Sequence, residues 1–278
     1  MALTVTSINT PSYASSYGHL SQHLQESDAL KFLDNVLQPQ YGDRALDFGC
    51  GTGNVTLDLA RRIGSDGFLV GVDPDDDRIR IAQNRLQSYD NVKIIRGSIS
   101  EATAFAPYDI INANHVIHWI PRGEHEEYLR KIFASLKPGG RFGFTTVHSL
   151  KGFIRDLSAS QYENSYDSFL SAIGWSFSSL AYWETLLKKT GFEISYGSEE
   201  ERVSGVFPDE RAFLEWWEAT CVGHFSAAQM APEALMTKYD LKRNEPIPIH
   251  ARHVDVVAKK PKKPNKGVRT FKADTLVE

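Results

Sequence analysis

The feature that most constrains the fold of this chain is a glycine-rich turn between a short strand and a helix. Arg44–Phe48 has the short apolar character of a buried strand, and Val55–Ile63 has a helical pattern that ends at Gly64. The turn itself comprises Gly49, Cys50, Gly51, Thr52 and Gly53, with Asp47 just before it. Because glycine permits sharp turns and close approach of a ligand, and a helix N-terminus offers unpaired N–H groups, this unit predicts a site for a polar ligand.

Short apolar segments alternate with helical patterns through the first half of the chain. Further strands are expected at 68–72, 92–96, 108–112 and 141–147, and helices at 77–87 and 124–136. This alternation is typical of a parallel sheet covered on both faces. With two more strands at 192–206 and 253–258, we expect a Rossmann-like α/β fold: a seven-stranded, mostly parallel sheet with helices on both faces.

The 278 residues suffice for one large domain. We expect residues 1–261 to form it, with an N-terminal helical lid at 1–38 and a cofactor-binding core at 40–148. A helical insertion after the fifth strand, at 149–190, is rich in aromatic residues and is expected to cap the substrate. Residues 191–261 would complete the sheet, and residues 262–278 are expected to form a flexible basic tail because the segment is charged and interrupted by proline.

An acidic residue farther along the chain supports the interpretation of the glycine turn as part of a cofactor site. Asp73 stands at the end of the second expected strand, 20 residues past Gly53. A carboxylate at this place can accept both hydroxyl groups of a ribose. The spacing is G-x-G-x-G, not the G-x-G-x-x-G of dinucleotide-binding enzymes. The turn, Asp47 and Asp73 together therefore predict a cofactor site.

Residues 40–148 resemble the class I S-adenosylmethionine-dependent methyltransferases, and the run Asp47–Gly53 resembles their first motif. The resemblance implies that the cofactor is S-adenosylmethionine, with Gly49–Gly53 beside its methionine part and Asp73 on its ribose. Further positions would lie toward the adenine: Pro74, Asp75, Ser98 and Ile99. Many members of this family carry Asp where Ser98 stands, so a hydroxyl group would replace a carboxylate there.

A second group of residues follows the fourth expected strand. Asn114, His115, His118 and Trp119 lie beyond its carboxyl end, where ligands bind in doubly wound sheets. Asn114 or His115 would contact the cofactor, and His118 and Trp119 would face the methyl acceptor.

The chain is similar to the juvenile hormone acid methyltransferases and, more distantly, to trans-aconitate methyltransferase. The matching segments are 24–30, 47–56, 118–120, 183–192 and 253–260. The resemblance implies that Gln25 and Trp119 hold a substrate carboxylate through an amide and an indole N–H. Tyr17 would close over the cofactor's sulfonium, whose charge favours an aromatic face.

A carboxylate acceptor is already an anion at pH 7 and needs no general base. The function expected from the resemblance is therefore O-methylation of a carboxylic acid with an apolar body. Two alternatives remain open. One is O-, N- or C-methylation of a natural product with His115 or His118 as the base. The other is a non-catalytic regulatory protein that binds the cofactor.

Composition limits the partners. The net charge of −4 disfavours nucleic acid, and no Asn/Asp-Pro-Pro-Tyr/Phe sequence follows the fourth strand. The two cysteines, Cys50 and Cys221, have no metal-ligand spacing, so no metal is expected. We see no signal peptide and no run of about 20 apolar residues. The expectation is a cytoplasmic enzyme without a membrane span that acts on a small molecule, its oligomeric state left open.

Overall fold

A computed structural model describes residues 28–162, 164–221 and 232–262. They contain a seven-stranded sheet of order β3-β2-β1-β4-β5-β7-β6, in which β7 runs antiparallel to both of its neighbours and the other pairs are parallel. The predicted Rossmann-like fold is confirmed. The strands are β1 (Arg44–Phe48), β2 (Phe68–Asp73), β3 (Val92–Arg96), β4 (Tyr108–Asn114), β5 (Leu136–Leu150), β6 (Glu193–Phe207) and β7 (Ile247–Lys259).

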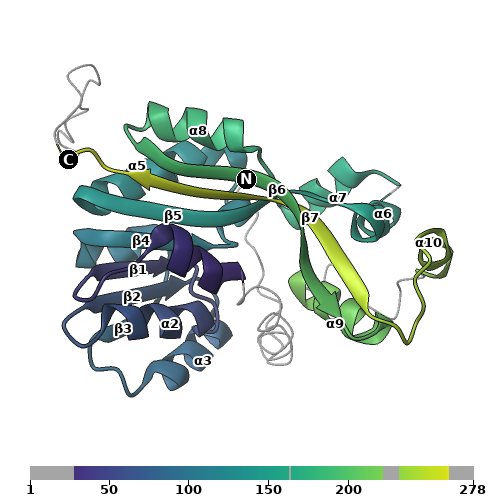
Figure 1. Cartoon of the computed structure of the whole chain (residues 1–278), viewed down its shortest axis with the longest axis horizontal. Helices are drawn as coiled ribbons and strands as arrows, with labels where there is room; N and C mark the ends of the chain where they lie inside the picture. Colours follow the sequence, from purple (N-terminus) through teal and green to yellow (C-terminus); the bar gives the residue numbers. More distant parts are fainter. Residues whose placement is uncertain (1–27, 163, 222–231, 263–278) are drawn as a thin grey trace, which may run out of the picture.

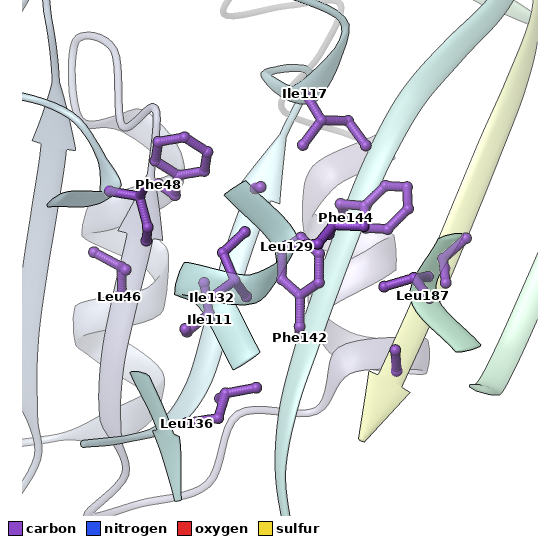
Figure 2. Packing of buried hydrophobic residues seen from close by; sticks show 14 of the residues in the cluster. Leu46, Phe48, Ile111, Ile117, Leu129, Ile132, Leu136, Phe142, Phe144 and Leu187 are labelled. Atoms are coloured by element: carbon purple, nitrogen blue, oxygen red, sulfur yellow. The ribbon is translucent and has the colours of Figure 1, made fainter. Parts of the chain in front are cut away.

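Alternate residues of the central strands serve two hydrophobic cores, one on each face of the sheet. Leu46 and Ile111 point to the core that is covered by α4 (Ile99–Ala102), α5 (His125–Ser135) and α8 (Leu180–Lys189). Figure 2 shows Leu129 and Ile132 of α5 packed beside Phe142 of β5 in this core. Ala45 and Ile110 point to the opposite core, which is covered by η1 (Leu33–Leu37), α2 (Asn54–Ile63) and α3 (Asp76–Leu86).

A third core lies in a helical lobe at one end of the molecule. Strands β6 and β7 run on beyond the main sheet and carry the lobe, as the green and yellow ribbons of Figure 1 show. Its helices are α6 (Gly152–Ser160), α7 (Tyr166–Ile173), α9 (Glu210–Thr220) and α10 (Glu233–Lys238). Phe207 and Ile247, at the far end of the β6–β7 pair, are buried between them.

The strand and helix boundaries depart from prediction mainly in the second half. β7 begins at Ile247 instead of residue 253, because its first half pairs with β6 inside the lobe. β5 begins at Leu136 instead of residue 141, since Leu136 pairs with Tyr108 ahead of a register shift. Helix α10 was not predicted. Of the expected N-terminal lid, residues 28–37 are helical, and Leu33 and Leu37 are fully buried.

Three short 3₁₀ turns complete the first half of the chain: η2 (Thr103–Phe105), η3 (Ile117–Trp119) and η4 (Arg122–Glu124). Within the described part of the chain, no helix combines the length and the apolar character that crossing a bilayer requires.

Candidate active site

The glycine turn has the backbone conformation that its sequence predicts. Gly49, Gly51 and Gly53 have φ values of +74°, +52° and +81°, a backbone conformation that residues with a side chain rarely adopt. The turn is held to β2 because Val72 O accepts hydrogen bonds from Gly49 N at 2.8 Å and Cys50 N at 3.0 Å. A Cβ at Gly51 would meet no atom within 4 Å. This open space beside the Gly51 backbone fits the expected cofactor, and a side chain at Gly51 would fill it.

Asp73 is fixed as part of the same turn. Its carboxylate accepts hydrogen bonds from Gly51 N and Asp75 N, each at 3.0 Å. Burial is the main cause that raises the pKa of the Asp73 carboxyl, and the nearby Arg78 and these two N–H groups oppose the increase. Each oxygen is oriented by one backbone donor and retains a lone pair for a ribose hydroxyl.

Asp47 has a different environment from the one that the cofactor role implies. Its side chain is 2% exposed, and both of its oxygens are hydrogen-bonded inside the protein. Thr56 Oγ1 donates to one at 2.6 Å, and Asn112 Nδ2 donates to the other at 2.8 Å. Burial raises the pKa of Asp47 against these two bonds. The carboxylate thus links β1 to α2 and β4 behind the glycine turn.

The positions expected near the adenine lie at two helix starts. Asp75 caps α3, where its side chain accepts a hydrogen bond from Arg78 N at 2.9 Å, and Pro74 beside it is exposed. Ser98 caps α4 in a capping box with Glu101. Ile99 is fully buried, so only its backbone can reach a ligand. The Ser98 hydroxyl, engaged with Ser100 N and Glu101, is likewise occupied in the protein.

The segment after β4 lies between the glycine turn and a separate cavity. On one side, Val116 contacts the turn so closely that a Cβ at Gly49 would collide with Val116 Cγ2. On the other side, His115, His118 and Trp119 line the cavity. His115 has a φ of +53°, and its N–H donates to Thr145 O at 2.8 Å, which fixes this strained position. The arrangement brings the two predicted sites together on one segment.

Two asparagines near the turn carry buried oxygens without a hydrogen-bond partner among the described residues. They are Oδ1 of Asn54, at the start of α2, and Oδ1 of Asn114, at the end of β4. Buried acceptors of this kind are normally satisfied. Amino and hydroxyl donors of a bound nucleoside cofactor would satisfy them, which supports the fit of S-adenosylmethionine to this site.

The cavity is aromatic and mostly apolar. Its volume is about 70 Å³, it opens to solvent, and it reaches from η3 to α9 in the lobe. Trp175 stands edge-on to both Trp119 and Trp217, at ring-centroid distances of 5.3 and 5.8 Å. Among the described residues that line it, none is Lys or Arg, and the Asp28 carboxylate is paired with Arg202 at 3.2 Å.

Three histidines around this cavity are neutral at physiological pH. Burial is the largest cause for each: the pKa falls to about 4 for His115, about 3 for His118 and about 2 for His253. Mutual repulsion between the rings adds to the effect for His118 and His253. The cavity therefore offers neutral hydrogen-bonding groups in place of charges.

Several polar atoms of the lining residues have no hydrogen-bond partner among the described residues. They are Nε1 of Trp175, Trp216 and Trp217, Oγ1 of Thr220 and Nδ1 of His253. The three indole groups can only donate, and leaving a buried donor unpaired costs about 1–3 kcal/mol. A ligand with hydrogen-bond acceptors would relieve that cost.

Part of the predicted substrate region lies at this cavity. Trp175 and Phe177 of the aromatic-rich insertion line it together with Trp216 and Trp217 of α9, whereas Trp183 packs under the sheet. Tyr17 and Gln25 lie outside the described residues, and no group of His, Cys, Asp and Glu in the described ranges is arranged to hold a metal ion. Four further residues line the cavity without having been predicted as site residues: Asp28 in the first described helix, Ser204 of β6, Thr220 at the end of α9 and His253 of β7.

Comparison with known proteins gives the site a context. A family described as a methyltransferase domain matches residues 21–196. A trans-aconitate 2-methyltransferase from Rhizobium meliloti is 39% identical over 97 residues, which are 34% of this chain and 35% of that protein. A demethylmenaquinone methyltransferase from Lactobacillus johnsonii is 27% identical over 143 residues, 50% of this chain and 57% of that protein. The alignments thus span little more than half the length of these curated relatives at most.

Solved structures share the fold at low sequence identity. A phosphoethanolamine N-methyltransferase from Haemonchus contortus, in complex with S-adenosyl-L-methionine, superposes with a TM-score of 0.58 at 20% identity. The match covers 91% of this chain and 57% of that one. At this identity the likeness concerns the fold.

Proposed function

Because the chain belongs to the class I S-adenosylmethionine-dependent methyltransferases, we propose that it methylates a carboxylic acid with an apolar body at a carboxylate oxygen. The observation that carries this proposal is the aromatic cavity across the Asn114–Trp119 segment from the glycine turn, with unpaired neutral donors in its wall. A methyl donor at the turn and an acceptor in the cavity would meet at this segment.

The reaction needs little from the protein beyond positioning. Bound S-adenosylmethionine supplies a methyl group that is already activated by its sulfonium. An O–CH₃ bond forms, the S–CH₃ bond breaks, and no proton is transferred, since the acceptor is ionised at pH 7. The protein's part is to hold the acceptor in line and to exclude water. Neutral donors suit this task, because a strong cation would stabilise the carboxylate and reduce its reactivity.

Trp119 and Gln25 are the residues proposed to hold the carboxylate. Trp119 is 38% exposed at the mouth of the cavity, edge-on to Trp175, and its indole N–H can donate. Gln25 lies outside the described residues, and its role rests on the resemblance. Asp28, three positions later, lines the cavity. The similarity to a trans-aconitate 2-methyltransferase supports a carboxylate acceptor.

The histidine-base alternative is weakened by the pKa values. A general base is most effective when its pKa lies near the working pH, and His115 and His118 titrate at about 4 and 3. With these pKa values either histidine would be deprotonated throughout about pH 6 to 9, as a carboxylate acceptor is, so the chemical class of the methylated product distinguishes the two hypotheses.

The test is a methyl-transfer screen with labelled S-adenosylmethionine that compares apolar carboxylic acids with phenols and amines of the same size. We expect the products to be methyl esters, which mild alkali hydrolyses so that the labelled methyl group is released as methanol. Trp119→Phe and Gln25→Leu should each lower kcat/KM for the acid by roughly ten- to a hundredfold without changing cofactor affinity. A product that is an ether or an amine would contradict the carboxylate assignment.

A further inference from the structure

A serine–histidine pair, Ser204 and His253, lies at the edge of the acceptor cavity. Ser204 Oγ and His253 Nε2 are 2.6 Å apart, and both residues line the cavity. His253 is 2% exposed. Its second ring nitrogen, Nδ1, is buried and has no hydrogen-bond partner among the described residues. One ring nitrogen is therefore fixed by the protein, and the other is left for a ligand.

Irregularities in two strands surround this pair. The β6–β7 register shifts between Val203 and Gly205, so that Ser204 is the additional residue of a bulge. The β5–β7 register shifts between Val147, which pairs with His253, and Ser149. Bulges often re-aim a side chain next to an active site. Here they accompany a hydroxyl that meets an imidazole across the ladder.

His253 also lies beside the methyl-transfer segment. Its ring is edge-on to that of His115, with centroids 5.5 Å apart, and His115 directly follows β4. A group held at His253 would therefore be close to the part of the cavity that faces the glycine turn.

The hydrogen bond with Ser204 is linked to which nitrogen of the His253 ring carries the proton. A neutral imidazole carries one N–H. If Ser204 donates its proton to Nε2, the ring proton is on Nδ1, and Nδ1–H becomes a donor toward the cavity. If Ser204 accepts from Nε2–H instead, Nδ1 presents only a lone pair, which would repel a carboxylate.

We propose that His253, held by Ser204 as the Nδ1–H tautomer, is a specificity-determining residue that donates a hydrogen bond to the acceptor carboxylate. The inference rests on the proposed function, because it names a further donor for the same group. It also accounts for the absence of Lys and Arg from the described lining of the cavity: a neutral N–H recognises the anion without forming an ion pair.

The experiment uses the whole chain with dodecanoic acid as the acceptor. The parent is first assayed for the methyl ester, and then four variants are compared: Ser204→Ala, Ser204→Thr, His253→Gln and Ser195→Ala. Ser195 Oγ donates to Val257 O at 3.0 Å on the same pair of strands but does not line the cavity, so it is the matched control. Ser204→Thr keeps the hydroxyl group.

We expect Ser204→Ala to raise KM for dodecanoic acid about tenfold while cofactor affinity stays at the parent value. Ser204→Thr and Ser195→Ala should keep the parent KM. Nitrogen NMR of ¹⁵N-histidine-labelled protein should show His253 protonated at Nδ1 in the parent and at a different ratio in Ser204→Ala. This readout does not depend on whether His253→Gln folds.

Parent KM in Ser204→Ala, or an Nε2–H tautomer in the parent, would overturn the inference while the proposed function stands. No ester from the parent with dodecanoic acid or any other apolar acid would overturn the proposed function and the inference with it.

Discussion

At the scale of single residues, the cofactor site depends on a carboxylate that has two tasks. Asp73 orients the glycine turn through Gly51 N and Asp75 N, and it is the proposed acceptor for the ribose hydroxyls. The sequence located Asp73 correctly at the strand end but could not show that its oxygens also brace the turn. That coupling depends on the φ of +52° at Gly51, which places the N–H opposite the carboxylate.

Replacing Asp73 should therefore weaken cofactor binding more than the loss of a ribose contact alone would. We expect Asp73→Ala to lower the affinity for S-adenosylmethionine at least tenfold, about 1.4 kcal/mol. Calorimetric titration measures it. Asp77→Ala, in the first turn of α3, is the matched control, because the ion pair of Asp77 in the described chain is with Arg80 and not with the glycine turn. Equal affinity in both variants would contradict the assignment of Asp73.

The buried histidines make a second prediction at this scale. His118 has a pKa of about 3 in the folded chain and near 6.5 when unfolded. Between these values the unfolded state binds more protons, so stability is fully present above pH 6.5 and is lost as the pH falls toward 3. The decrease in Tm from pH 7 to pH 5 should be smaller in His118→Gln than in the parent. His250 is exposed, so His250→Gln should show the same decrease in Tm between pH 7 and pH 5 as the parent. An equal decrease in the parent, His118→Gln and His250→Gln would contradict the role of buried His118 in the pH dependence.

At the scale of elements, the first described helix is held by ion pairs at two places. Asp28 pairs with Arg202 of β6 at 3.2 Å, and Arg202 also binds Asp255 of β7 through both guanidinium nitrogens, at 2.8 and 3.2 Å. Asp34 pairs with Arg62 of α2 at 2.7 Å. Of these charged residues, only Asp28 lines the acceptor cavity. Both ion pairs hold the helix in place, but only the one made by Asp28 can also affect the shape of the cavity.

The two carboxylates therefore form a matched pair of variants. Asp28→Asn should raise KM for the acceptor severalfold, because the helix end at the cavity loses its ionic contact with β6. Asp34→Asn removes the same charge from the same segment and should leave KM unchanged, with only a small change in Tm, since the Asp34 side chain is exposed and exposed ion pairs contribute little. Steady-state kinetics and thermal melts distinguish them. Equal KM values would show that Asp28 does not shape the site.

Elements of the first half were predicted closely because their signals are local. The strands β1 and β3 have the boundaries that their apolar runs indicate, and Gly64 ends α2 as expected. The second half depends on pairing between distant segments. Nothing within Ile247–Arg252 reveals that it pairs with the end of β6, and the contact of Ser204 with His253 follows from two register shifts. Strand pairing brings these two residues together, and the local sequence around either one does not indicate the contact.

At the scale of the whole molecule, the C-terminal end of the described chain is tied to the sheet. Lys260 O accepts a hydrogen bond from Gly139 N at 2.7 Å, and Lys260 Nζ donates to Leu136 O at 2.7 Å and Phe133 O at 2.8 Å. Burial lowers the pKa of this amine. The expected tail boundary at residue 261 thus falls immediately after a residue with several contacts.

A chain that ends at Pro261 should keep the parent Tm and turnover, because Lys260 and all its contacts remain. A chain that ends at Lys259 loses them and should melt several degrees lower. Thermal melts and the ester assay on both truncations provide the test. More than half of the activity lost at unchanged Tm in the longer truncation would show that residues 262–278 take part in function.

The continuous pairing of β6 with β7 also bears on how an acceptor enters. The ladder runs from Glu193 opposite Lys259 to Phe207 opposite Ile247, and it joins the main sheet to the helical lobe. Two paired strands resist bending far more than a single linker does. The lobe therefore cannot move away from the main sheet as a hinged domain without breaking this ladder, and a cross-link that stiffens the lobe should leave acceptor binding unchanged.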